Sequence, residues 1–287
     1  MSASPEVSAF AASDAYKDRP ESDVDNSTKR VNLGGQQYSV FGYQDDPKTG
    51  FHATAYQNTT THEIIIAYRG TDPDFKNHTR TTLQDAAVDY AMIKKQVNDQ
   101  KAAADAFTQE MIDKAEKHGI SKDHIFLAGH SLGGTLAEIE AWEHGLRGTT
   151  LNAYGAVDLI HGVPRGGNQV TNYVMAGDVV SAGSYHFGEV KVLASVEDIA
   201  ALKAGRYLDA PPGAPPPNPL RAMLLSDHSG AHFIGEGGME NVLAPGNIAA
   251  YEARCTQNRA AIAWTCSSNN FNRRARTTAC ASLNSAY

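Results

Sequence analysis

The sequence predicts an α/β protein with a mostly parallel central sheet flanked by helices. The chain has 287 residues, of which 41% are hydrophobic, and this is enough to bury one sizeable core. The run at 64–68 is apolar and rich in β-branched residues, as expected of a strand buried on both faces of a parallel sheet. Beyond residue 120, strand-like and helix-like stretches alternate, and this order requires crossover connections between parallel strands.

Each element is predicted from hydrophobic spacing and from residues that break regular structure. Pro20 ends the first helix, the turn-rich DDPKTG joins the first two strands into a hairpin, and Gly119 closes the longest helix. A proline-rich loop covers 205–219, because consecutive prolines cannot continue a strand ladder. The predicted elements, in order, are helix 7–16, strands 37–43, 51–57 and 64–68, helix 82–119, strand 125–128, helix 132–144, and strands 149–154 and 172–175.

The charge distribution separates the body of the chain from its C-terminal end. The net charge of -7 argues against a nucleic-acid partner, because such proteins need a basic face to displace counterions from phosphates. From Arg254 onward there are five arginines and no acidic residue. This end is either a contact for an anionic membrane surface or an acidic partner, or a solvated tail. It also holds all three cysteines, which allow at most one intrachain disulfide: Cys255, Cys266 and Cys280.

These features divide the chain into an N-terminal helix and linker (1–30), a main α/β domain (31–250) and a basic C-terminal tail (251–287). The first 20 residues lack the basic and apolar regions of a secretory signal, and no later run approaches the roughly 18 apolar residues of a membrane span. We therefore expect the protein to be cytoplasmic as made, and any export to use a route without a cleaved N-terminal signal.

The strongest chemical signal is the segment Gly129-His130-Ser131-Leu132-Gly133, which lies where an apolar strand gives way to a helix. A nucleophilic serine of the elbow type needs this sharp strand-to-helix turn, and small residues two before and two after it relieve the crowding. Ser131 is therefore the predicted nucleophile. The alternative is that its hydroxyl only caps the following helix.

Two backbone N–H groups are candidates for an oxyanion hole. The N–H of Leu132 lies at a helix N-terminus, where the dipole favours negative charge. The second donor is expected in the loop after an earlier central strand, and Tyr68-Arg69-Gly70-Thr71 follows the most apolar strand of the chain. The N–H of Thr71 is the candidate, and the alternative is that this segment is only a turn.

These segments resemble the class 3 lipase family of α/β-hydrolases. The most diagnostic are AYRGT at 67–71 and GHSLGG at 129–134; residues 172–180 and the HFG at 186–188 are similar to the region of the family's catalytic acid. The resemblance covers roughly residues 35–240 and extends more loosely to bacterial lipases delivered by type VI secretion. It implies an enzyme that cleaves the ester bonds of a phospholipid or acylglycerol at a membrane surface. An immunity protein or a secretion component is the implied protein partner.

The catalytic acid and base should follow the serine in that order. Asp178 lies just past the predicted strand 172–175 and is the favoured acid, with Asp158 as the alternative. For the base, the family pattern favours His228 in SDHSGAHF, and His232 is the alternative. The two histidines are spaced as metal ligands can be, but Gly230 between them is a poor helix former and the HExxH glutamate is missing.

In the resulting mechanism His228 accepts the Ser131 proton, Asp178 orients the ring, and no cofactor or metal is needed. The same fold also serves non-lipid esterases and thioesterases, and a catalytically silent copy that only binds a partner is the rival from another class. Two segments are candidates to cover an acyl chain: 72–82, and the proline-rich loop with the following Leu220, Met223, Leu224 and Leu225. The alternative for each is a surface connection.

Overall fold

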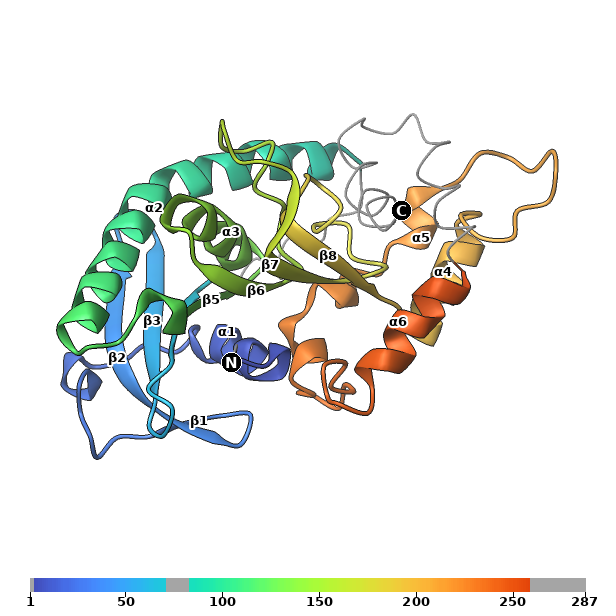
Figure 1. Ribbon diagram of the computed structural model, residues 1–287. Coiled ribbons are helices and arrows are strands. Elements are labelled where there is room, and N and C mark those ends of the chain that lie inside the picture. Colours follow the sequence, from blue (N-terminus) through green and yellow to red (C-terminus); the bar gives the residue numbers. More distant parts are fainter. Residues whose placement is uncertain (1–2, 71–82, 259–287) are drawn as a thin grey trace. The chain divides into compact units, whose positions relative to one another are not determined.

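The computed structural model describes residues 3–70 and 83–258 of the chain (Figure 1). The chain forms two compact units, Met1–Thr150 and Leu151–Tyr287. The elements of the first are α1 (Pro5–Asp14), η1 (Glu21–Asp23), β1 (Val31–Leu33), β2 (Gln36–Asp46), β3 (Phe51–Asn58), β4 (Ile64–Tyr68), α2 (Leu83–Lys117), η3 (Lys122–His124), β5 (Ile125–His130), α3 (Leu132–His144) and β6 (Arg147–Leu151), which ends at the boundary. Those of the second are β7 (Gly166–Met175), β8 (Phe187–Leu193), α4 (Val196–Ala204), α5 (Pro219–Ala222), η4 (Leu225–His228), η5 (Gly230–Phe233) and α6 (Ile248–Gln257).

The sheet of the first unit is mixed, and its strands follow the chain order from β1 to β6. Strands β1 to β4 pair antiparallel, and the predicted hairpin is confirmed, with Asp46 opposite Phe51 across the turn. Parallel pairing begins between β4 and β5, where Ile64 lies opposite Ile125. All five residues of β4 are buried, as its continuous apolar run predicts. The predicted α/β class is therefore confirmed.

Helices cover both faces of this sheet. Side chains along one strand alternate between the two faces, so the contacts of β3 show which helix covers each face. On β3, the ring of Phe51 lies 6.0 Å from that of Phe107 on α2. Five residues later, and hence on the opposite face, the Tyr56 hydroxyl donates a 2.9 Å hydrogen bond to Asp14 on α1. Helices α1 and α2 thus enclose the strands from opposite sides (Figure 1).

The first helix begins two residues earlier than its predicted start. Ser4 is the N-cap, and its hydroxyl accepts the N–H of Val7, while Pro5 takes the first helical position. The last residue, Asp14, is a buried carboxylate that forms ion pairs with Lys17 and Arg19. These cations and the Tyr56 hydroxyl compensate a charge that would otherwise be costly to bury.

In the second unit, β7 and β8 pair parallel, with Val174 opposite Val192. Strand β8 and helices α4 and α6 have no counterpart among the predicted elements. The strand predicted at 149–154 is β6, which ends earlier because Asn152 adopts a positive φ of 45° and leaves the strand conformation. The strand predicted at 172–175 is the end of the longer β7.

The C-terminal part of the described chain is a packed helix. The predicted boundary at residue 250 falls within α6, where Tyr251 and Cys255 are buried. The Arg254 guanidinium lies 4.7 Å from the Tyr251 ring centroid and donates to the Ala194 carbonyl. The rest of the predicted tail, with Cys266 and Cys280, lies outside the described residues, as does the candidate covering segment 72–82.

The proline-rich loop contains no regular element between α4 and α5, as its composition predicts. Among the described helices, none combines the length and the apolar character that crossing a membrane requires.

Candidate active site

The elbow is formed by the junction of β5 and α3. Ser131 stands between them with φ 57° and ψ -127°, a strained conformation for a residue with a side chain. Its hydroxyl makes no capping hydrogen bond to α3, so the structure does not support the alternative of a helix cap. The strained backbone of Ser131 is held in place by the buried strand before it and the buried helix after it.

Two glycines make the elbow possible through close backbone approach. A Cβ at Gly129 would collide with the carbonyl oxygen of Gly133, and a Cβ at Gly133 would collide with that of Tyr68 on β4. Both positions lie inside a packed layer with no flexible side chain to move aside. The G-x-S-x-G pattern therefore requires glycine at both positions for a steric reason.

A tyrosine of the N-terminal segment contacts a histidine of the elbow. The Nδ1 atom of His130 lies 3.2 Å from the hydroxyl of Tyr16, which follows α1. A Cβ at Gly70 would collide with the same hydroxyl. The residues after β4, the elbow and the N-terminal segment therefore lie close together here. The Nδ1 atom of His130 is therefore engaged within the scaffold, with Tyr16 as its partner.

Of the two oxyanion candidates, the structure describes one. Leu132 is the first residue of α3 and is buried. The first N–H groups of a helix have no partner within the helix, and they point along its positive dipole end. Thr71 lies outside the described residues, and Gly70 is the last residue described before it.

Asp178 and His228 come together in the second unit. Nδ1 of His228 lies 3.1 Å from Oδ1 of Asp178, although 50 residues separate them in the chain. Asp178 follows the end of β7, its side chain is 0% exposed, and its carboxylate accepts the backbone N–H groups of Val180 and Ser181 at 3.1 Å each. A proton on Nδ1 that is held by Asp178 leaves Nε2 of the ring as a base.

The electrostatics keep Asp178 charged. Burial opposes its ionisation, but the neighbouring His228 ring, the backbone N–H of Val180 and the side chain of Ser181 outweigh burial and lower the pKa of the carboxyl below its ordinary value. A carboxylate that stays ionised can hold the imidazole in one orientation and stabilise its cation.

The alternative residues have other partners. Asp158 receives the hydroxyl of Ser184 at 3.4 Å. Nε2 of His232 lies 3.1 Å from the carbonyl oxygen of Ser226 and 4.0 Å from a carboxylate oxygen of Asp227. The structure thus brings His228 to Asp178, and it places Asp158 and His232 in separate hydrogen-bonding environments.

A second pair of carboxyl groups, which the sequence analysis missed, lies beside this site. Oδ1 of Asp198 and Oδ2 of Asp227 approach the same point, where a Cβ at Gly177 would lie 2.7 Å from the first and closer still to the second. Both residues are buried, and neither of these oxygens has a hydrogen-bond donor among the described atoms. A proton shared between the two carboxyls satisfies both oxygens.

The proton belongs mainly to Asp227. Burial, together with the hydrogen bond and charge of Asp198, raises the pKa of Asp227 to about 9. Asp227 directly precedes His228, and its backbone carbonyl accepts the Asn152 side-chain amide at 2.5 Å. The only sequence signal for Asp227 was its place beside the candidate base, and Asp198 showed none. In the structure the other carboxylate oxygen of Asp198 belongs to the N-terminal capping box of α4, where it accepts the N–H of Ser195.

A strand–serine–helix elbow in a helix-flanked mixed sheet is the arrangement of α/β-hydrolases. The family model described as phospholipase-like, Tle-like phospholipase domain, matches residues 7–210, which is well over half of the chain. The chain belongs to this family. It is therefore an enzyme of the lipase and phospholipase class that hydrolyses ester bonds of lipids. The match includes Ser131 and Asp178 and ends before His228 and His232.

Comparison with solved structures found similar chains among fungal lipases. A triacylglycerol lipase from Penicillium expansum is 18% identical with a TM-score of 0.42, and the alignment covers 67% of this chain and 79% of that one. The Lip2 lipase from Yarrowia lipolytica is 15% identical with a TM-score of 0.38, covering 66% and 76%. A search of curated protein sequences found no significant match.

Proposed function

We propose that the enzyme cleaves the carboxylic ester bond of a phospholipid through an acyl-enzyme formed on Ser131. In this proposal His228 is the general base, Asp178 orients it, and the N–H groups of Leu132 and Thr71 bind the oxyanion. The observation that carries the proposal is the 3.1 Å contact between His228 Nδ1 and a fully buried, ionised Asp178. This pair leaves the other ring nitrogen able to take a proton.

The two halves of the reaction follow from these roles. His228 Nε2 takes the Ser131 proton as Oγ attacks the ester carbon, and the same proton then leaves with the alcohol part of the lipid. Water next attacks the acyl-serine, gives its proton to His228, and releases the fatty acid with Ser131 restored. The N–H donors stabilise the negative oxygen in both tetrahedral intermediates.

The choice of a phospholipid is supported by the family to which the chain belongs, whose model is described as a phospholipase domain. The class 3 lipase resemblance also allows an acylglycerol. The two substrates are distinguished by offering phosphatidylethanolamine vesicles and a triacylglycerol emulsion and by identifying the products. Free fatty acid together with lysophospholipid is the expected result.

The test of the mechanism is Ser131→Ala. We expect ester hydrolysis to fall by about 10³-fold or more and labelling by a fluorophosphonate probe to disappear, because the nucleophile is removed. Ser121→Ala is the matched control, since Ser121 is an exposed serine outside the elbow. Circular dichroism should be unchanged in both variants. Wild-type turnover in Ser131→Ala would refute the acyl-enzyme, and absent activity and labelling in the wild type would favour a silent binding fold.

We also propose that the enzyme acts after export by a type VI-like route that needs no cleaved signal, and that an immunity protein protects the producing cell. The resemblance to secreted lipases supports this role. Expression in a test bacterium with an added periplasmic signal should arrest growth, whereas cytoplasmic expression and the periplasmic Ser131→Ala variant should not. Equal toxicity of the active enzyme in both compartments would contradict the proposal.

A further inference from the structure

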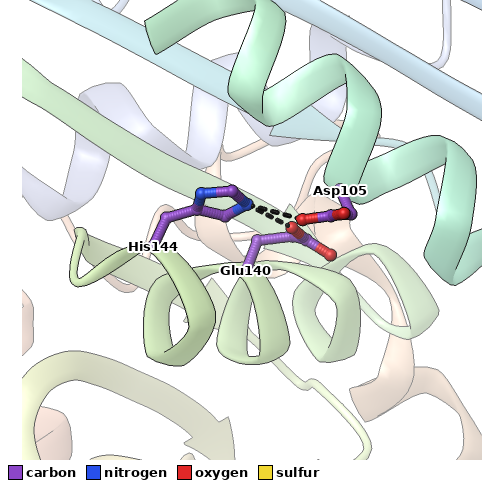
Figure 2. A group of neighbouring side chains, drawn as sticks. All are labelled: Asp105, Glu140 and His144. Carbon is purple, nitrogen blue, oxygen red and sulfur yellow. Dashed lines mark hydrogen bonds and ion pairs between the residues drawn. The ribbon is translucent and has the colours of Figure 1, made fainter.

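We propose that Asp105, Glu140 and His144 form a binding site for a divalent zinc ion between α2 and α3. Figure 2 shows the three side chains converging, with Asp105 on α2 and the other two on α3. One ligand atom from each lies within 4.8 Å of the other two. The site belongs to the first unit and is separate from the proposed active site.

The spacing of the ligands follows from the helix. Glu140 and His144 are four residues apart, so they share one face of α3. Nε2 of His144 lies 2.9 Å from Asp105 Oδ1 and 3.3 Å from Glu140 Oε2. Ligand atoms around a tetrahedral zinc ion with bonds of about 2.1 Å are about 3.4 Å apart. Small side-chain movements would therefore place all three on one ion.

The strongest observation is the state of Glu140. Its side chain is 0% exposed, and neither carboxylate oxygen accepts a hydrogen bond from the described residues. When Nε2 of His144 carries a proton, that proton is hydrogen-bonded to Asp105, and one N–H cannot also be aligned with Glu140.

A cation would supply the missing compensation. Zinc is bound by imidazole nitrogen and carboxylate oxygen, and three protein ligands leave one position for water. The nearby Lys101 does not fill this role, because its ammonium lies 2.7 Å from a Glu143 oxygen and pairs with that residue. The site also lies near the C-terminal end of α3, where the helix dipole favours a positive charge.

The position of the site indicates an ion that stabilises the helix pair and takes no part in the proposed reaction. Helix α3 begins directly after Ser131 and ends at His144, so its 13 residues place the ligands about 20 Å from the elbow. The ion would tie the C-terminal end of α3 to α2. Binding should therefore stabilise the first unit and should not depend on Ser131.

Zinc binding is tested with the full chain, stripped by a chelator and titrated with zinc chloride against a chromogenic competitor. We expect one equivalent per chain and at least about tenfold weaker binding in Asp105→Asn, with a similar loss in Glu140→Gln. Asp105→Asn is the informative variant because its side chain is half-exposed and its loss should not unfold the protein. Asp113→Asn and His124→Gln, which change exposed residues outside the site, should bind like the wild type.

Two further measurements separate this site from adventitious binding. Zinc at about 100 times the wild-type Kd should raise the Tm of the wild type by ~5 °C or more and raise that of Asp105→Asn by about half as much or less. X-ray absorption should show nitrogen and oxygen neighbours only, at about 2.0–2.1 Å. A sulfur shell at about 2.3 Å, binding that Asp105→Asn does not weaken, or no bound zinc would each overturn the proposal.

Discussion

The Ser131 elbow and the Asp178–His228 pair are held in place by different kinds of force. The elbow depends on backbone packing, since Gly129 and Gly133 leave no room for a side-chain carbon. The pair depends on hydrogen bonds, because Asp178 is oriented by two backbone N–H groups and by the His228 ring. The elbow lies between two regular elements, whereas His228 ends a short 3-10 turn in a loop-rich region.

This difference determines which changes each region should tolerate. Steric constraints do not titrate, so the elbow should respond to side-chain volume and be insensitive to pH. Hydrogen-bonded carboxyls respond to their proton state, so the region around His228 should respond to pH and to isosteric changes that alter charge.

The largest expected effect is that of Asp178→Asn. We expect turnover to fall by about 10⁴-fold, because the amide cannot hold the His228 ring in the required tautomer or stabilise its cation. Asp158→Asn is the matched control and should keep turnover within about tenfold, since Asp158 contacts Ser184 instead. Steady-state hydrolysis of a phospholipid measures both. A larger loss in Asp158→Asn would move the acid to the earlier position.

The next largest effect distinguishes the two histidines that are candidates for the general base. His228→Ala should slow fluorophosphonate labelling of Ser131 by at least about 10³-fold, because the general base is removed. His232→Ala should change the labelling rate by less than about tenfold, because the His232 ring is hydrogen-bonded to the Ser226 carbonyl. Circular dichroism would establish that both variants fold. If only His232→Ala lost labelling, the two roles would have to be exchanged.

The steric constraint on the Ser131 elbow is tested by Gly133→Ala. The added carbon would collide with the carbonyl oxygen of Tyr68, so we expect a loss of at least about 3 kcal/mol in the free energy of unfolding. Gly246→Ala is the control, because a Cβ there meets no atom within 4 Å. Urea denaturation at two pH values would measure the change. Near-equal stability of the two variants would show that the elbow relaxes easily.

The last prediction is specific to the hydrogen-bonded region and concerns Asp227→Asn. The folded protein keeps the Asp227 proton up to about pH 9, whereas the unfolded chain releases it near the ordinary pKa of 3.8. Stability that is fully present below pH 3.8 is therefore lost as the pH rises toward 9, with a slope of at most about 1.4 kcal/mol per pH unit for one proton.

An amide at position 227 does not titrate and can donate to Asp198. Asp227→Asn should therefore have a flatter dependence of Tm on pH and should exceed the wild type in Tm at pH 8. Asp113→Asn, at an exposed site on α2, should run parallel to the wild type. Parallel curves for Asp227→Asn would show that the two carboxyls share no proton.

Features that depend on local constraints could be predicted from the sequence. The apolar run at 64–68, the hairpin, the long helix and the G-x-S-x-G turn are encoded by neighbouring residues, and all are found where predicted. Shorter elements were missed where the local signal was weak, as in β8, where a glycine and two charged residues interrupt the apolar alternation.

Which distant side chains meet could be seen only in the folded chain. The sequence left Asp158 and Asp178, and His228 and His232, as alternatives, because the path of the loops between them is not a local property. The contact across 50 residues between His228 and Asp178 required the folded chain. The same holds for the buried carboxyls of Asp198 and Asp227 and for the cluster around Glu140, because burial and partner geometry, which set the protonation of these groups, exist only after packing.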